Sequence, residues 1–432
     1  MTTSPISGDR DDKELICQDV ASGLSGRLSL SDLKVTLTSF GDPIPSPKTD
    51  ILHFVLEKRG YASLLQWFEG GGQQTYGTAA TFTSQEYIAN TILIGPRPWR
   101  STDRIRYASF TFTNAEIALH YAEHLNDRGV RKRASKRKQY LHVDVYAPHR
   151  SEIISLRSAS LSITLRMLTT VGGSGGFLNS RITSIPQVIL SFPKHITLEE
   201  TYRKIKDVLT FFELSIGTAC RVAKVSVSPE SREAFDSYWS RNEMPPLFDV
   251  YWHFPELKPT RTRLHPSVAI FKAYKRSTRT DLGKRLIVWL ERRADWYVTY
   301  ELMSSYLATE RAYSSVRILR LMAWFESLPL YQQRLKISSK QIDKLAERSK
   351  RAARELGIST TEQRLRETLS ALRYPSLASR IERAIKKLRV RFGKEIVGSD
   401  LIELCLTGIK IRNHAAHGNT PLRLDTRTRL DV

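Results

Sequence analysis

The chain has 432 residues, 41% of them hydrophobic and 9% aromatic, which is enough for about two or three domains with apolar cores. Its sequence contains no run of about 18 apolar residues, so no membrane-spanning helix is expected. Cys17, Cys220 and Cys405 are far apart and match neither a disulfide framework nor a metal-ligand spacing. With a polar, acid-containing N-terminus unlike a secretory signal, these features predict a cytoplasmic protein with no metal, other cofactor or membrane partner.

The net charge is the unusual property of this chain. Lysine and arginine number 67 against 44 aspartates and glutamates, a net charge of +23. Residues 271–432 hold 34 of these basic residues and 17 of the acidic ones, so this part alone carries +17. Such a surface concentrates polyanions and favours nucleic acid as the partner. Attraction to anionic lipid, or a basic surface that is merely solvated, is the alternative.

Strand and turn patterns dominate the first part of the chain. Apolar and polar residues alternate over 33–37 and 107–112, as in half-buried strands. Gly70–Gly72 and Gly172–Gly176 are typical of turns or flexible loops, and the second lacks the Lys-Ser/Thr of a phosphate-binding loop. A further strand over 187–192 is expected to end at Pro193.

Helical signals begin with Thr197 and Glu200, which form a predicted capping box. After a strand from Val222 to Val227, the helical period runs from about Leu282 to near the end of the chain. Within that region we predict helices over 316–330, from Ser338 or Ser339 to Gly357, from Thr360 (paired with Gln363) to before Pro375, from Leu377 to Gly393, and after a cap at Ser399.

These patterns predict an α+β protein in two parts. A β-rich N-terminal domain is expected over 1–270, and a helical region over 271–432, with an all-α bundle from about residue 310.

Arg412 and His417 are the residues best suited to chemistry. Cutting RNA without a metal requires a group that takes the 2′-hydroxyl proton, one that protonates the leaving 5′-oxygen, and a cation beside the phosphorus. Histidine suits proton transfer near neutral pH, and arginine grips phosphate oxygens while staying charged. Five helical residues separate the two side chains by about 140°, so two facing copies would be needed to close a site. The alternative is a helix end, with Gly418 as its stop.

The sequence around these two residues, RNHAAHG over 412–418, resembles the R-x4-6-H motif of HEPN domains, in which a polar residue such as Asn413 follows the arginine. Three further stretches resemble helices of the ApeA-type HEPN domain: 316–330 (with Glu326 at its usual acidic position), 377–388 and 402–410. In the first part of the chain, 91–95, 105–114 and 196–227 resemble the ApeA N-terminal domain.

This resemblance implies a bacterial anti-phage factor that acts by abortive infection, through a metal-independent endoribonuclease. It implies that His417 is the general acid/base, that Arg412 is the phosphate clamp, and that Asn413 orients either His417 or the scissile phosphate. Both subunits of a homodimer would supply one copy of each. His414 either assists binding of the substrate or is merely exposed. Glu326 either pairs with Arg412 or another basic residue, or is a solvated acid. The implied partners are RNA, with tRNA or another structured RNA as candidates, and a phage-derived trigger.

A cluster of basic residues offers a second candidate contact, with the phosphates of RNA or of a phage component, and the alternative is a solvated loop. It comprises Arg128, Arg131, Lys132, Arg133, Lys136, Arg137 and Lys138. His120 and His124 lie four apart on a predicted helix, but without a third ligand a packing or surface role is favoured over a metal site.

Only 14 residues follow Gly418, whereas HEPN domains usually continue with a further helix. The alternative function is therefore a catalytically inactive HEPN scaffold that binds RNA or a protein partner.

Overall fold

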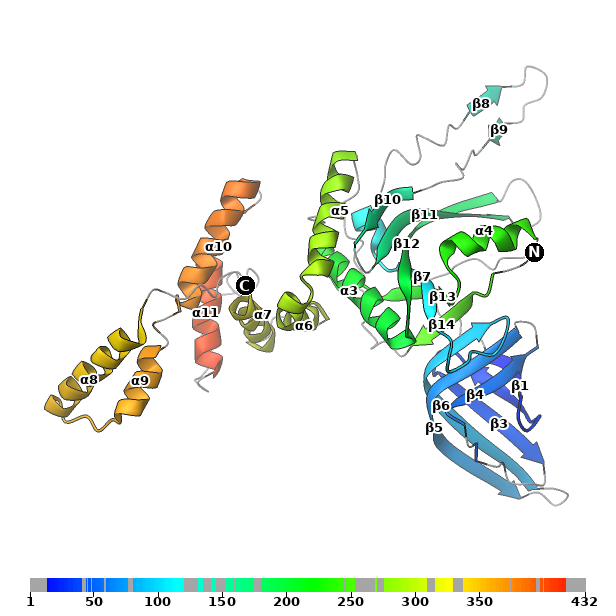
Figure 1. Ribbon diagram of the computed structural model, residues 1–432, viewed down its shortest axis with the longest axis horizontal. Coiled ribbons are helices and arrows are strands. Elements are labelled where there is room, and N and C mark those ends of the chain that lie inside the picture. The colour runs from blue at the N-terminus through cyan, green and yellow to red at the C-terminus, as the bar shows by residue number, and fades with distance from the viewer. Residues whose placement is uncertain are drawn as a thin grey trace. The chain divides into compact units, whose positions relative to one another are not determined.

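The computed structural model describes residues 14–40, 44, 46–47, 49–57, 60–76, 81–119, 131–134, 141–144, 152–158, 161–173, 180–241, 243, 245–252, 269, 276–308, 315–328, 337–370, 372, 374–393, 397–398 and 400–416. The chain divides into two compact units, Met1–Glu291 and Arg292–Val432. The first is rich in strands and the second is helical (Figure 1), so the predicted α+β class is confirmed. The expected functional boundary after residue 270 stays a prediction, because compact units are delimited by contacts and not by roles.

Six strands of the first unit close into a small barrel. They are β1 (Glu14–Asp19), β2 (Ser25–Ser29), β3 (Lys34–Phe40), β4 (Ile51–Leu56), β5 (Gly60–Tyr76) and β6 (Thr81–Gly95). The order β6-β3-β2-β1-β4-β5 returns to β6 through the β5–β6 pairing, and neighbouring strands are antiparallel. Because side chains alternate along each strand, Leu28, Val35, Phe54 and Leu64 point inward and fill the interior.

An open sheet continues from β6 in the order β14-β13-β7-β12-β11-β10. Its strands are β7 (Ile105–Phe112), β10 (Glu152–Arg157), β11 (Ser162–Gly173), β12 (Ser180–Ile196), β13 (Val222–Ser228) and β14 (Phe248–Trp252). Helices α1 (Ala115–Leu119), α3 (Leu198–Ile216) and α5 (Arg276–Glu291) pack on one face (Figure 1). On the other face, Phe235 of α4 (Arg232–Ser240) packs with Tyr107 and Ile189.

Helix α3 begins where the sequence predicts. The Thr197 hydroxyl accepts the Glu200 N–H at 3.1 Å, and the Glu200 carboxylate accepts the Thr197 N–H at 2.8 Å. The helix ends at Gly217, whose φ of 75° lies in the left-handed region that glycine adopts freely. Ile205, Val208 and Phe212 follow the helical period into the sheet core, as the apolar spacing requires.

The prediction that Gly70–Gly72 forms a turn is wrong, because the three glycines lie inside β5. The register against β6 shifts between Glu69 and Gly72, which marks a bulge. A Cβ at Gly70 would lie 2.9 Å from the Ile88 Cδ1 atom, so a larger residue here would require the Ile88 side chain to move. Gly172 and Gly173 likewise belong to β11, paired with Arg181 and Ser180, and 174–176 lie outside the described residues.

The predicted end of a strand at Pro193 is also wrong, since β12 runs on to Ile196. The ladder to β7 is irregular between Ser191 and Ile196, so Pro193 occupies a stretch where the missing N–H breaks no regular pairing.

The basic cluster is not simply the exposed loop that the sequence predicts. Residues 131–134 form β8 (Arg131–Ala134), which pairs with β9 (Leu141–Asp144). Pairing with a segment seven residues further on overrides the local polar composition. The remaining cluster members, Arg128 and 136–138, lie outside the described residues.

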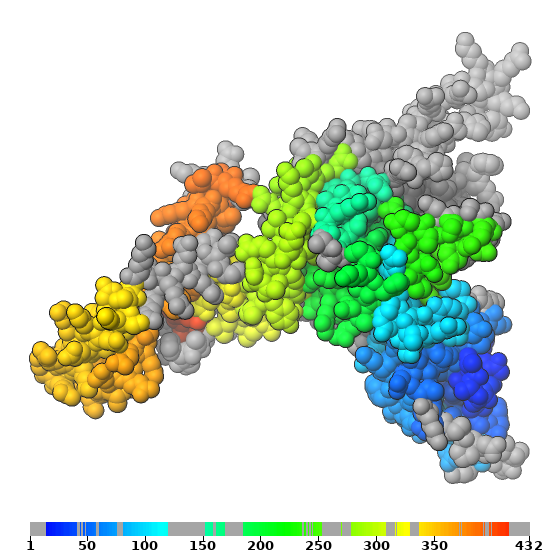
Figure 2. Space-filling view, in the orientation of Figure 1, coloured from blue at the N-terminus to red at the C-terminus, as the bar shows by residue number. Residues whose placement is uncertain are grey.

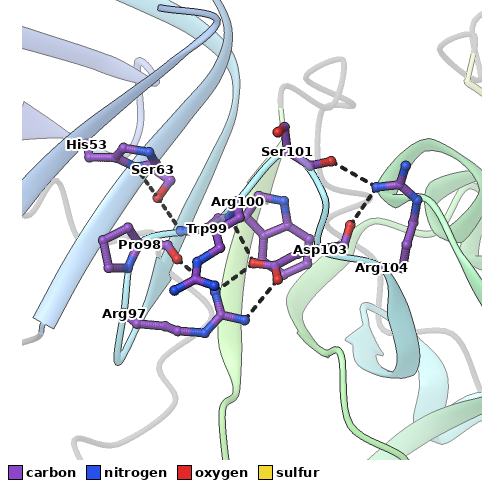
Figure 3. A network of polar contacts seen from close by, with 9 residues as sticks. All are labelled: His53, Ser63, Arg97, Pro98, Trp99, Arg100, Ser101, Asp103 and Arg104. Atoms are coloured by element: carbon purple, nitrogen blue, oxygen red, sulfur yellow. Dashed lines mark hydrogen bonds and ion pairs between the residues drawn. The ribbon is translucent and has the colours of Figure 1, made fainter.

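The connection between β6 and β7 joins the barrel to the open sheet and is held by charge-assisted bonds (Figure 3). The Arg97 guanidinium donates to both carboxylate oxygens of Asp103, at 2.7 and 3.0 Å. Asp103 also accepts the Arg100 N–H at 2.8 Å. Burial raises the pKa of the Asp103 carboxyl, but the bonds from Arg97 and Arg100 outweigh it, so its pKa lies below the usual value.

The same connection places Trp99 in the core, only 3% exposed. The backbone N–H of Trp99 donates to the Ser63 hydroxyl at 3.0 Å, and that hydroxyl lies 3.0 Å from the His53 Nδ1 atom (Figure 3). The indole meets the Phe248 ring edge-on, with centroids 4.9 Å apart. A Cβ at Gly95 would overlap the Phe248 ring, so glycine is required here.

The second unit contains η3 (Ala294–Trp296), α6 (Tyr297–Ala308), α7 (Ser315–Ser327), α8 (Ser339–Glu355), α9 (Glu362–Ser370), α10 (Leu377–Phe392) and α11 (Leu401–Ala416). Helices α7, α10 and α11 share a core that includes Ile318, Met322, Ile381 and Ile411. Helices α8 and α9 pack side by side (Figure 2). In the part of the chain that the structure describes, none of the helices has the length and apolar character needed to cross a membrane.

The caps of these helices largely match the sequence pattern. Ser338 caps α8 through a capping box, and α10 ends at Gly393. Helix α9 begins one residue later than predicted, because the Thr361 hydroxyl accepts the Arg364 N–H at 3.2 Å. Ser399, the predicted cap of the last helix, lies outside the described residues.

Candidate functional site

Arg412 lies in the last described turns of α11, beside the core of the second unit. Its neighbour Ile411 is 5% exposed and packs with residues of α7 and α10, which anchors this end of the helix. The Arg412 side chain keeps 34% of its surface exposed. About two thirds of this side chain is therefore covered by its surroundings.

Glu326, near the end of α7, binds Arg412 across the bundle. The Arg412 Nη2 atom lies 3.0 Å from Oε1 and 3.2 Å from Oε2 of the carboxylate. The Nη1 atom donates to the Asn413 side-chain oxygen at 3.1 Å. The sequence left open whether Glu326 pairs with a basic residue or is a solvated acid, and in the structure it pairs with Arg412. Any role of Glu326 in chemistry stays a prediction. These contacts hold the guanidinium in one orientation.

Arg380 of α10 completes the surroundings of Glu326. Its Nη1 atom donates to the Glu326 carbonyl at 3.2 Å, so it caps the C-terminal end of α7, where cations are favoured. The carboxylate and the carbonyl of one residue are thus bound by two arginines from different helices. This arrangement brings two positive side chains to one place.

A pocket of about 720 Å³ opens beside these groups, within the range of small-molecule sites. Its lining comes from the end of α7, the start of α10 and the end of α11: Glu326, Tyr374, Pro375, Ser376, Leu377, Ala378, Arg380, Ile409, Arg412 and Asn413. Two guanidinium groups and one carboxylate make the lining suitable for an anion.

The structure brings together only some of the predicted site residues. Arg412, Asn413 and Glu326 meet at the pocket. The backbone of His414 belongs to α11, and His417 lies outside the described residues. Their roles, like those of the other site residues, stay predictions.

In the first unit, the candidate RNA contacts Arg131, Lys132 and Arg133 belong to β8, whereas Lys136, Arg137 and Lys138 lie outside the described residues, as do His120 and His124. Among the residues that can be described, no three His, Cys, Asp or Glu side chains are grouped as metal ligands.

Sequence reasoning missed Arg380, Tyr374 and Ser376 at this site. The one available signal was the N-cap of α10, where the Ser376 hydroxyl accepts the Ser379 N–H at 3.2 Å. Even this signal predicts only a helix start, because the meeting of α7, α10 and α11 depends on tertiary packing.

The fold and the site define a two-unit α+β protein with a barrel-containing N-terminal unit and a basic helical unit. Residues 25–275 match the family described as ApeA N-terminal domain 1, and the chain belongs to this family. The match confirms the resemblance of the first part of the chain, and family membership indicates an anti-phage defence protein. No curated protein and no solved structure gave a significant match.

Proposed function

We propose that this protein is a metal-independent HEPN endoribonuclease of a bacterial anti-phage system, which acts by abortive infection and cuts RNA through Arg412 and His417 at a homodimer interface. The observation that carries the proposal is the position of Arg412, held by Glu326 and Asn413 at the wall of a pocket that suits anions. The net charge of +17 over 271–432 supports RNA as the anion.

The proposed chemistry assigns one task to each residue. A His417 imidazole takes the 2′-hydroxyl proton, and the 2′-oxygen attacks the adjacent phosphorus. The leaving 5′-oxygen receives a proton from an imidazolium, so the products end in a 2′,3′-cyclic phosphate and a 5′-hydroxyl. Arg412 binds the phosphate oxygens as negative charge builds up on them, and Asn413 limits the rotation of its guanidinium. Each protomer supplies one copy of the motif.

The deciding experiment compares the wild type with Arg412→Ala and His417→Ala for growth arrest on overexpression. Total RNA is examined for fragments that end in 2′,3′-cyclic phosphate, with and without a chelator of divalent metals. Lys410→Ala is the matched control, because it removes the same charge from an exposed position of α11. Arg412→Lys keeps the positive charge but removes the planar guanidinium, which can bind two phosphate oxygens at once, and we expect this variant to lose most activity.

The alternative proposal is an HEPN scaffold that binds RNA or a partner without cutting. It is favoured by the Glu326 contact, which already engages Arg412. Intact RNA in cells that express the wild type, even during phage challenge, would support the scaffold and refute the nuclease. Salt-sensitive RNA binding is common to both proposals and does not distinguish them.

A further inference from the structure

The pocket beside Arg412 extends well beyond the group that would hold a scissile phosphate. Much of its lining comes from Tyr374–Ala378 and Arg380, around the first turn of α10. Tyr374 is 44% exposed and contributes to the wall of the pocket. Pro375 is buried and holds the chain in place directly before the helix cap at Ser376.

The electrostatics of this wall favour a second anionic group. Arg380 donates one of its five N–H groups to the Glu326 carbonyl. Its Nε atom is buried and has no hydrogen-bond acceptor among the described residues. The N-terminus of α10 adds the positive end of a helix of 16 residues. Arg380 and Arg412 both bind Glu326, so the two cations lie near each other. Two neighbouring anionic groups of one ligand can therefore contact both.

Taken together, an exposed aromatic ring and a second cation beside a phosphate clamp match the parts of a nucleotide. Aromatic side chains stack on unpaired bases, and arginine binds the phosphate that follows. A base inside a duplex is already stacked on both faces and cannot enter a pocket of this kind without leaving the helix.

We propose that the pocket is a subsite for one unpaired nucleotide next to the scissile phosphate, with its base against Tyr374 and its phosphate on Arg380. This inference rests on the proposed nuclease function and deepens it. It adds the residues that would hold an unpaired nucleotide beside the cut, Tyr374 and Arg380. Arg412 then binds one phosphate and Arg380 its neighbour along the same strand.

The test measures binding by the full chain in the His417→Ala background, so that the RNA stays intact. The probes are a fluorescent unstructured RNA of about 12 nucleotides, the same sequence in a duplex, and a nucleoside monophosphate as competitor. Base–aromatic stacking of about 1–3 kcal/mol corresponds to about 5- to 150-fold weaker binding of the single strand by Tyr374→Ala. Tyr374→Phe should bind as the parent does.

Arg380→Ala should weaken binding of the same single strand more than Arg383→Ala does. Arg383 is an exposed arginine on α10 that does not line the pocket, so it controls for loss of one charge. Circular dichroism verifies that each variant keeps its helices. Tyr374→Ala binding that equals the parent, or equal affinity for duplex and single strand, would overturn the subsite. Displacement of the RNA by the monophosphate at equal concentration would show that the pocket binds a free nucleotide, and would refute an RNA strand as its ligand.

Cleavage assays keep this inference separate from the proposed function. If the protein with His417 cuts RNA, but Tyr374→Ala and Arg380→Ala leave KM unchanged, the subsite is refuted and the nuclease stands. If the protein does not cut, but single-strand binding depends on Tyr374 and Arg380, the nuclease is refuted and the pocket is a nucleotide-binding site of the scaffold.

Discussion

Replacing Glu326 by glutamine should strengthen the binding of RNA, because the carboxylate competes with phosphate for Arg412. A phosphate on the open edge of the guanidinium would lie about 6 Å from the carboxylate, given N–O contacts of about 2.8 Å. Two negative charges at about 6 Å repel by ~0.7–2.8 kcal/mol for effective dielectric constants of about 80 down to 20. Both side chains are about a third exposed, so solvent screening places the effect at the lower end.

We therefore expect Glu326→Gln to bind a single-stranded RNA about 3- to 10-fold more tightly than its parent. Glutamine keeps a side-chain oxygen that accepts a bond from Arg412, so the orientation of the guanidinium should survive. The measurement is fluorescence anisotropy at about 150 mM salt in the His417→Ala background. Glu403→Gln is the matched control, since it removes one charge from an exposed position of α11. Threefold weaker binding by Glu326→Gln, with Glu403→Gln unchanged, would show that the carboxylate positions Arg412 and does not restrain it.

Three further predictions concern the N-terminal unit, each read from denaturant unfolding. Thr197→Ala removes the α3 capping box and should lower the free energy of unfolding by about 0.5–2 kcal/mol, whereas an unchanged midpoint would mean that the cap contributes nothing. Trp99→Ala empties a core position and should cost about 3–5 kcal/mol; a smaller loss than 1 kcal/mol would contradict its role in joining barrel and sheet. The pKa of Asp103 is lower in the folded than in the unfolded chain, so its ionised carboxylate stabilises the fold at pH values above the unfolded pKa. This stabilisation is lost as the pH falls through the folded pKa, so the free energy of unfolding of the wild type should decline below about pH 4. Asp103→Asn should be less stable at pH 7 and show less of this decline, and an identical pH profile would refute the argument.

The sequence was sufficient where structure is decided over a few residues. The capping box at Thr197 and the helix end at Gly393 were predicted correctly, and Ser338 is one of the two caps that the sequence offered for α8. These predictions succeed because a cap depends on side chains within one helical turn. The helices that carry Glu326 and Arg412 were found in the same way, from their apolar period. The α+β class followed from the change of period along the chain.

Local signals failed where a distant strand decides the outcome. Gly70–Gly72 is typical of a turn, yet pairing with β6 draws it into a long strand with a bulge. Pro193 stands inside β12 because the ladder is already irregular there. The closure of the barrel depends on β5 pairing with both β4 and β6, which no local pattern encodes.

The same distinction between local signals and distant contacts applies to the candidate site. From the sequence, residue type and spacing indicated Arg412, and the resemblance to HEPN domains indicated Asn413 and Glu326; both signals depend on short stretches of sequence. Only the tertiary structure decided that Glu326 and Arg412 form an ion pair across 86 positions of the chain, and that Arg380 joins them at a pocket. The physical reason is that contact between α7, α10 and α11 follows from the apolar core they share, and the polar groups at its rim are brought together as a consequence.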